Sequence, residues 1–139
     1  MASDLESKLN EKFKSAGERR IADVLNKYGI AFVYEQPMAV QDQQNKLRIW
    51  YPDFFLPEYG IYLEYNGIHG NIDYDIGKAK RESTYKRNGL EVINIGHHIR
   101  PCQLENYILN RIYGIQKLRY SKIKSRIYEL RTGKSSRYH

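Results

Sequence analysis

Apolar side chains recur every three or four positions near the start of the chain. The residues that follow this spacing are Leu5, Leu9, Phe13, Ile21, Leu25 and Tyr28. Such a period is typical of amphipathic helices, so we expect helix over residues 4–28, with a break at Ser15, Ala16 and Gly17. Ser15 and Glu18 also match the capping-box pattern of a helix start.

A different pattern follows, with short apolar and aromatic runs separated by turn residues. The runs at 30–35, 47–55, 61–65 and 90–95 are rich in β-branched and aromatic side chains and therefore predict strands. Residues 56–60 contain Pro57 and Gly60, so runs 47–55 and 61–65 should form an antiparallel hairpin.

The helical spacing returns between the last two of these runs and again after them. Residues 76–88 form an expected basic helix, and a strand, helix and strand in this order predict a right-handed crossover between parallel neighbours. Residues 103–113 should form a further helix that packs on the sheet, and Gly114 should break it before a basic helix over 115–130. The sequence thus predicts an α/β fold with a mixed sheet of about four strands and basic C-terminal helices.

The composition is that of one domain. We assign residues 1–100 to a core, 101–131 to a helical extension of that domain and 132–139 to a disordered tail. Cys102 is the one cysteine among 139 residues, and no run of about 18 apolar residues occurs. We therefore expect an intracellular, cytoplasmic protein that does not enter a membrane.

Charge is divided unevenly along the chain. Residues 1–76 hold 8 Lys and Arg against 12 Asp and Glu, whereas residues 77–139 hold 15 against 4. The second part should therefore face a polyanion, for which DNA is the expected partner. The expected contact residues are Lys80, Arg81, Lys86, Arg87, Lys117, Arg119, Lys122, Lys124 and Arg126.

Two carboxylates, Asp53 and Glu64, stand near the ends of the two runs of the expected hairpin and should lie close together. A third, Glu18, shares a helix face with apolar residues, although it could simply cap its helix. Oxygen ligands of this kind suit Mg²⁺, with Mn²⁺ as an alternative. The backbone carbonyl of Tyr65 could add a ligand. A metal held there could activate water for phosphodiester hydrolysis, with His69, Lys78 or Lys80 as the side chains that position or deprotonate the water.

Several of these residues resemble a known group of nucleases. Pro52 and Asp53, followed by Leu63-Glu64-Tyr65-Asn66-Gly67, resemble the PD-(D/E)XK nuclease superfamily, whose core is restriction-endonuclease-like. Residues 15–18, 29–35 and 51–57 resemble phage junction-resolving endonucleases. That likeness implies Glu18, Asp53 and Glu64 as metal ligands.

The segment from Glu64 to His69, with the basic helix and strand after it, looks more like very-short-patch-repair endonucleases and related homing endonucleases. In that branch the histidine after the Asn-Gly pair is a catalytic base. The superfamily lysine should stand at position 66, where this chain has Asn66. This departure favours the repair and homing branch, and the resemblance is compatible with a phage or mobile-element gene.

We therefore expect a metal-dependent DNA endonuclease, site-specific and of the homing or repair type, that forms a homodimer. Two alternatives remain open: a Holliday junction resolvase, and a catalytically inactive nucleic-acid binding module. No glycine-rich phosphate loop, Ser-His-Asp arrangement or CxxC pair is present, so no small-molecule cofactor is expected.

Overall fold

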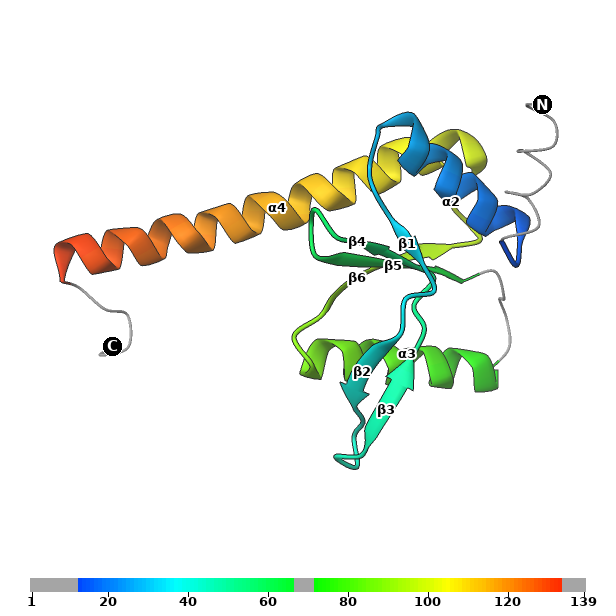
Figure 1. Cartoon of the computed structure of the whole chain (residues 1–139), viewed down its shortest axis with the longest axis horizontal. Helices are drawn as coiled ribbons and strands as arrows, with labels where there is room; N and C mark the ends of the chain where they lie inside the picture. Colours follow the sequence, from blue (N-terminus) through cyan, green and yellow to red (C-terminus); the bar gives the residue numbers. More distant parts are fainter. Residues whose placement is uncertain (1–12, 67–71, 134–139) are drawn as a thin grey trace. The chain divides into compact units, whose positions relative to one another are not determined.

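The computed structural model describes residues 13–66 and 72–133, and of residues 72–75 it describes the backbone alone (Figure 1). The chain divides into two compact units, Met1–Glu105 and Asn106–His139. The elements in chain order are α2 (Ala16–Lys27), β1 (Val33–Tyr34), β2 (Met38–Gln41), β3 (Leu47–Trp50), β4 (Phe54–Leu56), β5 (Ile61–Asn66), α3 (Ile72–Arg87), β6 (Glu91–Gly96) and α4 (Pro101–Thr132).

A mixed sheet of four strands, in the order β1-β4-β5-β6, forms the centre of the first unit. β4 pairs antiparallel with β5, as the hairpin prediction requires. β5 and β6 are parallel neighbours joined through α3, and Glu64 lies opposite Asn94 in their register. The α/β class, the mixed sheet and the parallel pairing across a helix are therefore confirmed.

The two faces of this sheet carry different helices, α2 on one side and α3 on the other (Figure 1). Paired residues of neighbouring strands share a face, so Phe54, Leu63 and Ile93 line one side together. Tyr65 belongs to the same face, and its ring lies where a Cβ on Gly17 of α2 would be. Alternation along β5 therefore turns Glu64 toward the opposite side of the sheet.

The α3 side has a small core of its own. Met38 and Val40 of β2 pack with Tyr85 of α3, and Trp50, Tyr62, Leu90 and Val92 pack against these three. β2 and β3 form a separate two-stranded sheet. This hairpin thus belongs to the α3 side of the unit.

Three strand predictions were wrong in detail. Residues 47–55 are not one run, because the chain leaves β3 at Trp50 and enters β4 at Phe54, and Pro52 between them has no N–H for a ladder. The strand expected over 30–35 is reduced to Val33–Tyr34. β2 was not expected at all, since its four residues Met38–Gln41 follow Pro37 directly.

The helix predictions also need correction. α2 begins at Ala16 with Ser15 as its N-cap, whose hydroxyl accepts from the Glu18 N–H at 3.1 Å, so the capping prediction is confirmed; residues 1–12 lie outside the described part. α3 begins at Ile72, four residues before the expected start. Gly114 does not break α4, which continues to Thr132. A glycine inside a helix costs only about 1 kcal/mol relative to alanine.

The long helix α4 changes character along its length. Leu104, Ile108 and Ile112 are buried, whereas Leu118 and Ile123 are 55% and 57% exposed. In the described part of the chain, no helix has the length and apolar run that crossing a bilayer requires.

Candidate functional site

Glu18 is a buried carboxylate in the first turn of α2, with 3% of its surface exposed. Its Oε1 accepts from the Lys14 backbone N–H and from the Tyr34 hydroxyl, each at 3.1 Å. Burial raises the pKa of Glu18, and the nearby charge of Asp53 raises it further, while the bond from Tyr34 opposes both. Glu18 therefore does more than cap its helix, because it faces another carboxylate.

Asp53 lies between β3 and β4, directly after the buried Pro52. Its Oδ2 accepts from the Tyr65 backbone N–H at 2.7 Å, which fixes the carboxylate against the end of β5. Lys14 Nζ is 3.9 Å from its Oδ1 and 2.7 Å from Glu35 Oε1. The bond to Glu35 raises the pKa of Lys14 despite its partial burial. This side of the site is thus three carboxylates around one lysine.

Glu64 is buried on the other face of β5 and has stronger partners. Its Oε1 accepts from Arg81 Nη2 and from the Tyr85 hydroxyl, both at 2.5 Å. The Arg81 guanidinium also lies 5.9 Å from the centre of the Trp50 ring. Burial raises the pKa of Glu64, the bonds from Tyr85 and Arg81 oppose this, and the charge of Asp53 adds to the rise.

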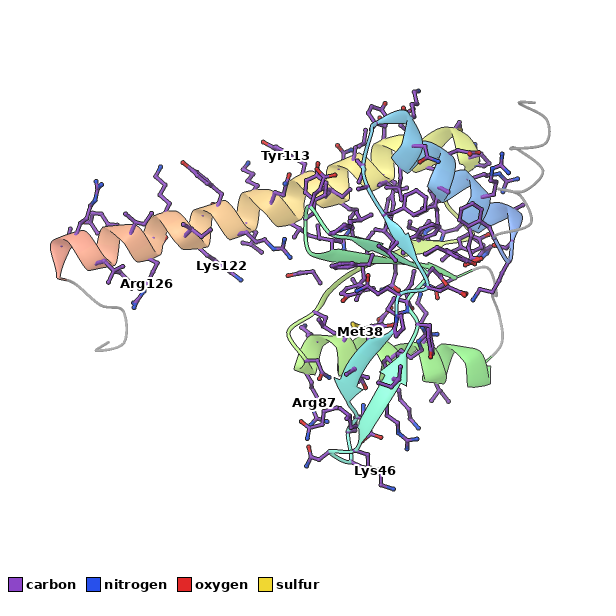
Figure 2. All side chains as sticks on the ribbon, viewed as in Figure 1. Met38, Lys46, Arg87, Tyr113, Lys122 and Arg126 are labelled. Atoms are coloured by element: carbon purple, nitrogen blue, oxygen red, sulfur yellow. The ribbon has the colours of Figure 1, made fainter. Side chains whose placement is uncertain are left out.

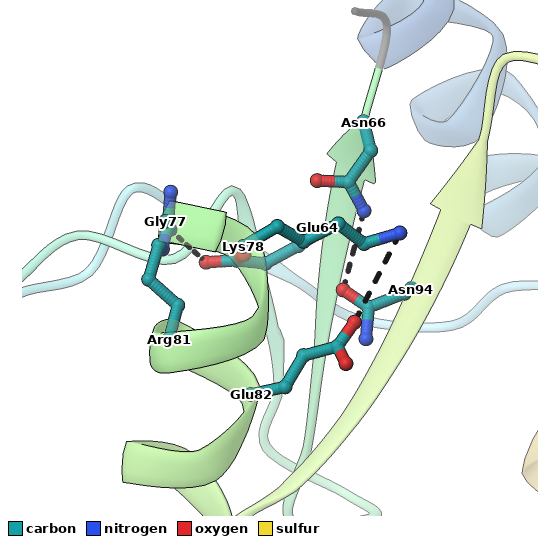
Figure 3. Close-up of a pocket in the computed structure, with 7 residues that line it drawn as sticks. All are labelled: Glu64, Asn66, Gly77, Lys78, Arg81, Glu82 and Asn94. Atoms are coloured by element: carbon teal, nitrogen blue, oxygen red, sulfur yellow. Dashed lines mark hydrogen bonds and ion pairs between the residues drawn. The ribbon is translucent and has the colours of Figure 1, made fainter. Parts of the chain in front are cut away.

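A cavity of about 320 Å³ opens beside Glu64 (Figure 3). Lys78 reaches across it from α3, with its Nζ 3.9 Å from Glu82 Oε1. On the strand side, the Asn66 side-chain amide donates to Asn94 Oδ1 at 3.2 Å. Asn66, at the position where a family lysine was expected, is therefore 7% exposed and bonded to the neighbouring strand.

The structure brings most of the predicted catalytic residues into one neighbourhood. Asp53 acts electrostatically on both Glu18 and Glu64, which lie on opposite faces of the sheet. Lys78 lines the cavity beside Glu64, and Tyr65 contributes its N–H. His69 lies outside the described residues.

The predicted DNA-contacting residues are dispersed. Lys80 lines a second cavity next to Arg81, and Arg87 donates to Asp42 and Asn45 of the β2–β3 turn. Lys86 is exposed on α3. The remainder belong to the second unit and lie on α4, where Figure 2 labels Lys122 and Arg126: Lys117, Arg119, Lys122, Lys124 and Arg126.

Four residues of the site were missed by sequence reasoning. Lys14, Tyr34 and Glu35 surround Glu18 and Asp53, and Tyr85 holds Glu64. The spacing of Arg81 and Tyr85, four residues apart on one helix, places both on one face and could have pointed to a shared partner. Nothing in the spacing of Lys14 and Glu35 relates them to Asp53.

The donor chemistry of Glu18 and Asp53 fits a hard divalent cation, because two like charges face each other and only oxygen atoms are offered. Glu64 instead has Arg81 as its counter-ion. Across residues 13–66 and 72–133, no group of three or more His, Cys, Asp or Glu side chains is arranged to hold a metal ion. The pair Glu18 and Asp53 is therefore the part of the predicted metal set that fits directly.

Charge separates the two units sharply. Met1–Glu105 holds 14 Lys and Arg against 15 Asp and Glu, for a net charge of −1, while Asn106–His139 holds 9 against 1, for +8. The carboxylate site thus belongs to the slightly acidic unit, whereas the excess positive charge that could attract a polyanion belongs to the other unit.

Comparison of the chain with protein-family models, with curated proteins and with solved structures found no match.

Proposed function

We propose that the chain is a divalent-metal-dependent DNA endonuclease with a restriction-endonuclease-like core. The observation that carries this proposal is the pair of facing carboxylates Glu18 and Asp53 at one end of the sheet, where Asp53 raises the pKa of Glu18 and also that of Glu64. Buried like charges are costly unless a cation compensates them. A chain with a net charge of +7 would bring DNA to such a site.

Each carboxylate would have a separate task. Asp53 and Glu18 would hold Mg²⁺ or Mn²⁺ with the Tyr65 carbonyl, and Glu64 would become a further ligand on exchanging Arg81 for the metal. When bound, the ion would supply a Lewis acid for the phosphate and lower the pKa of a water. The Tyr65 N–H orients Asp53, and Tyr34 holds Glu18 in place. Lys78 would meet the scissile phosphate, and His69 would act on the attacking water.

The basic residues of the second unit would bind the DNA backbone without reading its sequence. We propose a site-specific substrate of the homing or repair type, in keeping with Asn66, and a homodimer as the active form. Resolution of four-way junctions is the alternative substrate, and it uses the same chemistry.

A second candidate function is nucleic-acid binding without catalysis. The ion pair between Arg81 and Glu64 favours it, because a carboxylate with an arginine counter-ion is already neutralised at its buried Oε1. This candidate predicts DNA affinity that does not depend on Asp53 beyond its charge.

Cleavage assays with Mg²⁺, Mn²⁺ or EDTA test the nuclease directly, with supercoiled plasmid, matched duplex and four-way junction as substrates. We expect Asp53→Ala to lower the cleavage rate more than about 100-fold, because a metal ligand is lost. Asp23→Ala is the matched control, since Asp23 is exposed in α2 and pairs only with Arg19 in the described contacts. Equal cleavage by the Asp53 and Asp23 variants would contradict the proposal. Binding to DNA without cleavage of any substrate would favour the second candidate.

A further inference from the structure

Arg81 of α3 lines two cavities, one toward the sheet and one toward the β2–β3 hairpin. The first, of about 320 Å³, is the one beside Glu64 that Lys78 crosses (Figure 3). The second, of about 300 Å³, is lined by α3 and the β2–β3 hairpin. Arg81 lines both, so the two cavities meet at its side chain. Each is at the small end of the range for ligand sites.

The second cavity combines cations with groups that suit a nucleotide. Its cationic members are Arg48, Lys80 and Arg81, and Asp42 is the acidic one. Arg48 is held in place by Asp42 at 3.0 Å. Such cations serve as contacts for phosphate oxygens.

Neutral groups of the same cavity could meet a base. Gln43 and Gln44 come from the turn of the hairpin, and Trp50 presents part of its ring. Side-chain amides pair with base edges, and aromatic rings stack on bases. The cavity therefore offers both kinds of contact that a nucleotide requires.

The first cavity has the character of a reaction site instead. Lys78 and Arg81 are its cations, and Glu82 and the buried Glu64, which pair with them, are its carboxylates. Asn66 and Asn94 close its strand side through their mutual bond. A phosphate entering here would meet two cations next to the proposed metal ligands.

We propose that the two cavities form one binding groove for a polynucleotide strand, which crosses α3 at Arg81. One phosphate lies between Lys78 and Arg81 in the first cavity, and the adjacent nucleotide lies in the second, near Lys80, Gln43 and Gln44. This inference rests on the proposed nuclease function, because it names the path of the substrate through the same site. It assigns to the β2–β3 hairpin the role of contacting the nucleotide next to the cleaved bond.

Binding of a fluorescein-labelled oligonucleotide in EDTA tests the groove without any cleavage. We expect Lys78→Gln and Lys80→Gln each to weaken binding about fivefold and to reduce the salt dependence of the affinity by about one unit of slope. Lys27→Gln is the matched control, because Lys27 is an exposed lysine of α2 that lines neither cavity and pairs with Glu105. We expect it to change the affinity less than twofold.

A second variant separates the hairpin from the lysines. Gln43→Ala with Gln44→Ala leaves the charge unchanged and should weaken binding of a mixed-sequence strand, with the salt slope preserved. Equal effects of the three lysine variants, or no effect of the glutamine pair, would overturn the groove. A failure of the wild-type chain to bind in EDTA would also overturn it.

The outcome for the nuclease is read separately, from the cleavage assays with Asp53→Ala. A chain that cuts DNA but binds equally well in all lysine variants is a nuclease with another substrate path. A chain that binds through the groove but cuts nothing is a binding protein.

Discussion

Glu18 and Glu64 are two buried glutamates with opposite electrostatic surroundings. Glu64, on the α3 side of the sheet, accepts bonds from a guanidinium and a phenol. Glu18, on the α2 side, has a phenol and a backbone N–H as donors, and the charge with the largest effect on its pKa is that of Asp53, which raises it. Their exposures, 5% and 3%, are nearly equal. The electrostatic difference between the two glutamates therefore does not come from their solvent exposure, and their partners account for it.

This comparison indicates where a cation is needed. An ion pair with Arg81 compensates Glu64, whereas among residues 13–66 and 72–133 Glu18 and Asp53 have Lys14 as their nearby cation, and its Nζ is closer to Glu35 than to Asp53. A divalent cation would relieve the second arrangement more than the first. The α2 side is therefore the expected point of metal entry, and the α3 side the expected point of phosphate contact.

Removal of Arg81 should have the largest effect on stability. Arg81→Met leaves the buried Glu64 with Tyr85 alone, and we expect a loss of about 2 kcal/mol in the free energy of unfolding, which takes into account that the arginine is half exposed. Arg81→Lys should lose less, because a charge remains. Denaturant unfolding measures both. Combining Arg81→Met with Glu64→Gln should recover most of the lost stability. A double variant as unstable as Arg81→Met alone would contradict the role of Arg81 as the counter-ion of Glu64.

The two phenols allow a matched comparison of the two sides. Tyr85→Phe removes a bond to Glu64 in a site that is 2% exposed, whereas Tyr34→Phe removes a bond to Glu18 in a half-buried one. We expect losses of about 1.5 and about 1 kcal/mol, because both bonds have a carboxylate acceptor and the Tyr85 bond is the more deeply buried. Equal losses, measured by the same unfolding titration, would mean that the sides do not differ.

The smallest effect should be the pH dependence due to Glu18. Burial and the charge of Asp53 raise its pKa above the ordinary 4.5, so the folded chain binds this proton more tightly than the unfolded one. Stability therefore falls as the pH rises from 4.5 through the raised value. Glu18→Gln removes this contribution to the pH dependence of stability, so the variant should be more stable than the wild type at pH 7.5 but not at pH 4. Parallel unfolding curves at both pH values would show that Glu18 is not perturbed.

The sequence alone predicted the class, the mixed sheet and the parallel strands, because their periods and turn residues are local. β5 and β6 each correspond to one apolar run in the sequence. α2 shows both the regular spacing of apolar residues and the N-cap serine that are typical of a helix. The β2–β3 hairpin was missed because each of its strands has only four residues and lies near a proline, Pro37 before β2 and Pro52 after β3. The helix break expected at Gly114 was wrong, because a helix tolerates one glycine at modest cost.

The sequence predicted the carboxylates of the site but not the side chains that pair with them. Asp53 and Glu64 stand at strand ends, where residue types carry a signal. Arg81 was assigned to surface contacts with DNA, yet it bonds Glu64 because the crossover helix returns over β5. Lys14 and Glu35 approach Asp53 from separate segments, and such tertiary encounters leave no spacing to recognise.

Titration calorimetry of the wild-type chain with Mg²⁺ measures whether Glu18 and Asp53 bind a cation. We expect binding that Asp53→Asn and Glu18→Gln abolish and that Asp23→Asn leaves unchanged, because Asp23 is an exposed carboxylate on the same helix as Glu18. Binding of equal strength in the wild type and in Asp53→Asn, or no binding in the wild type, would contradict a cation site at these carboxylates.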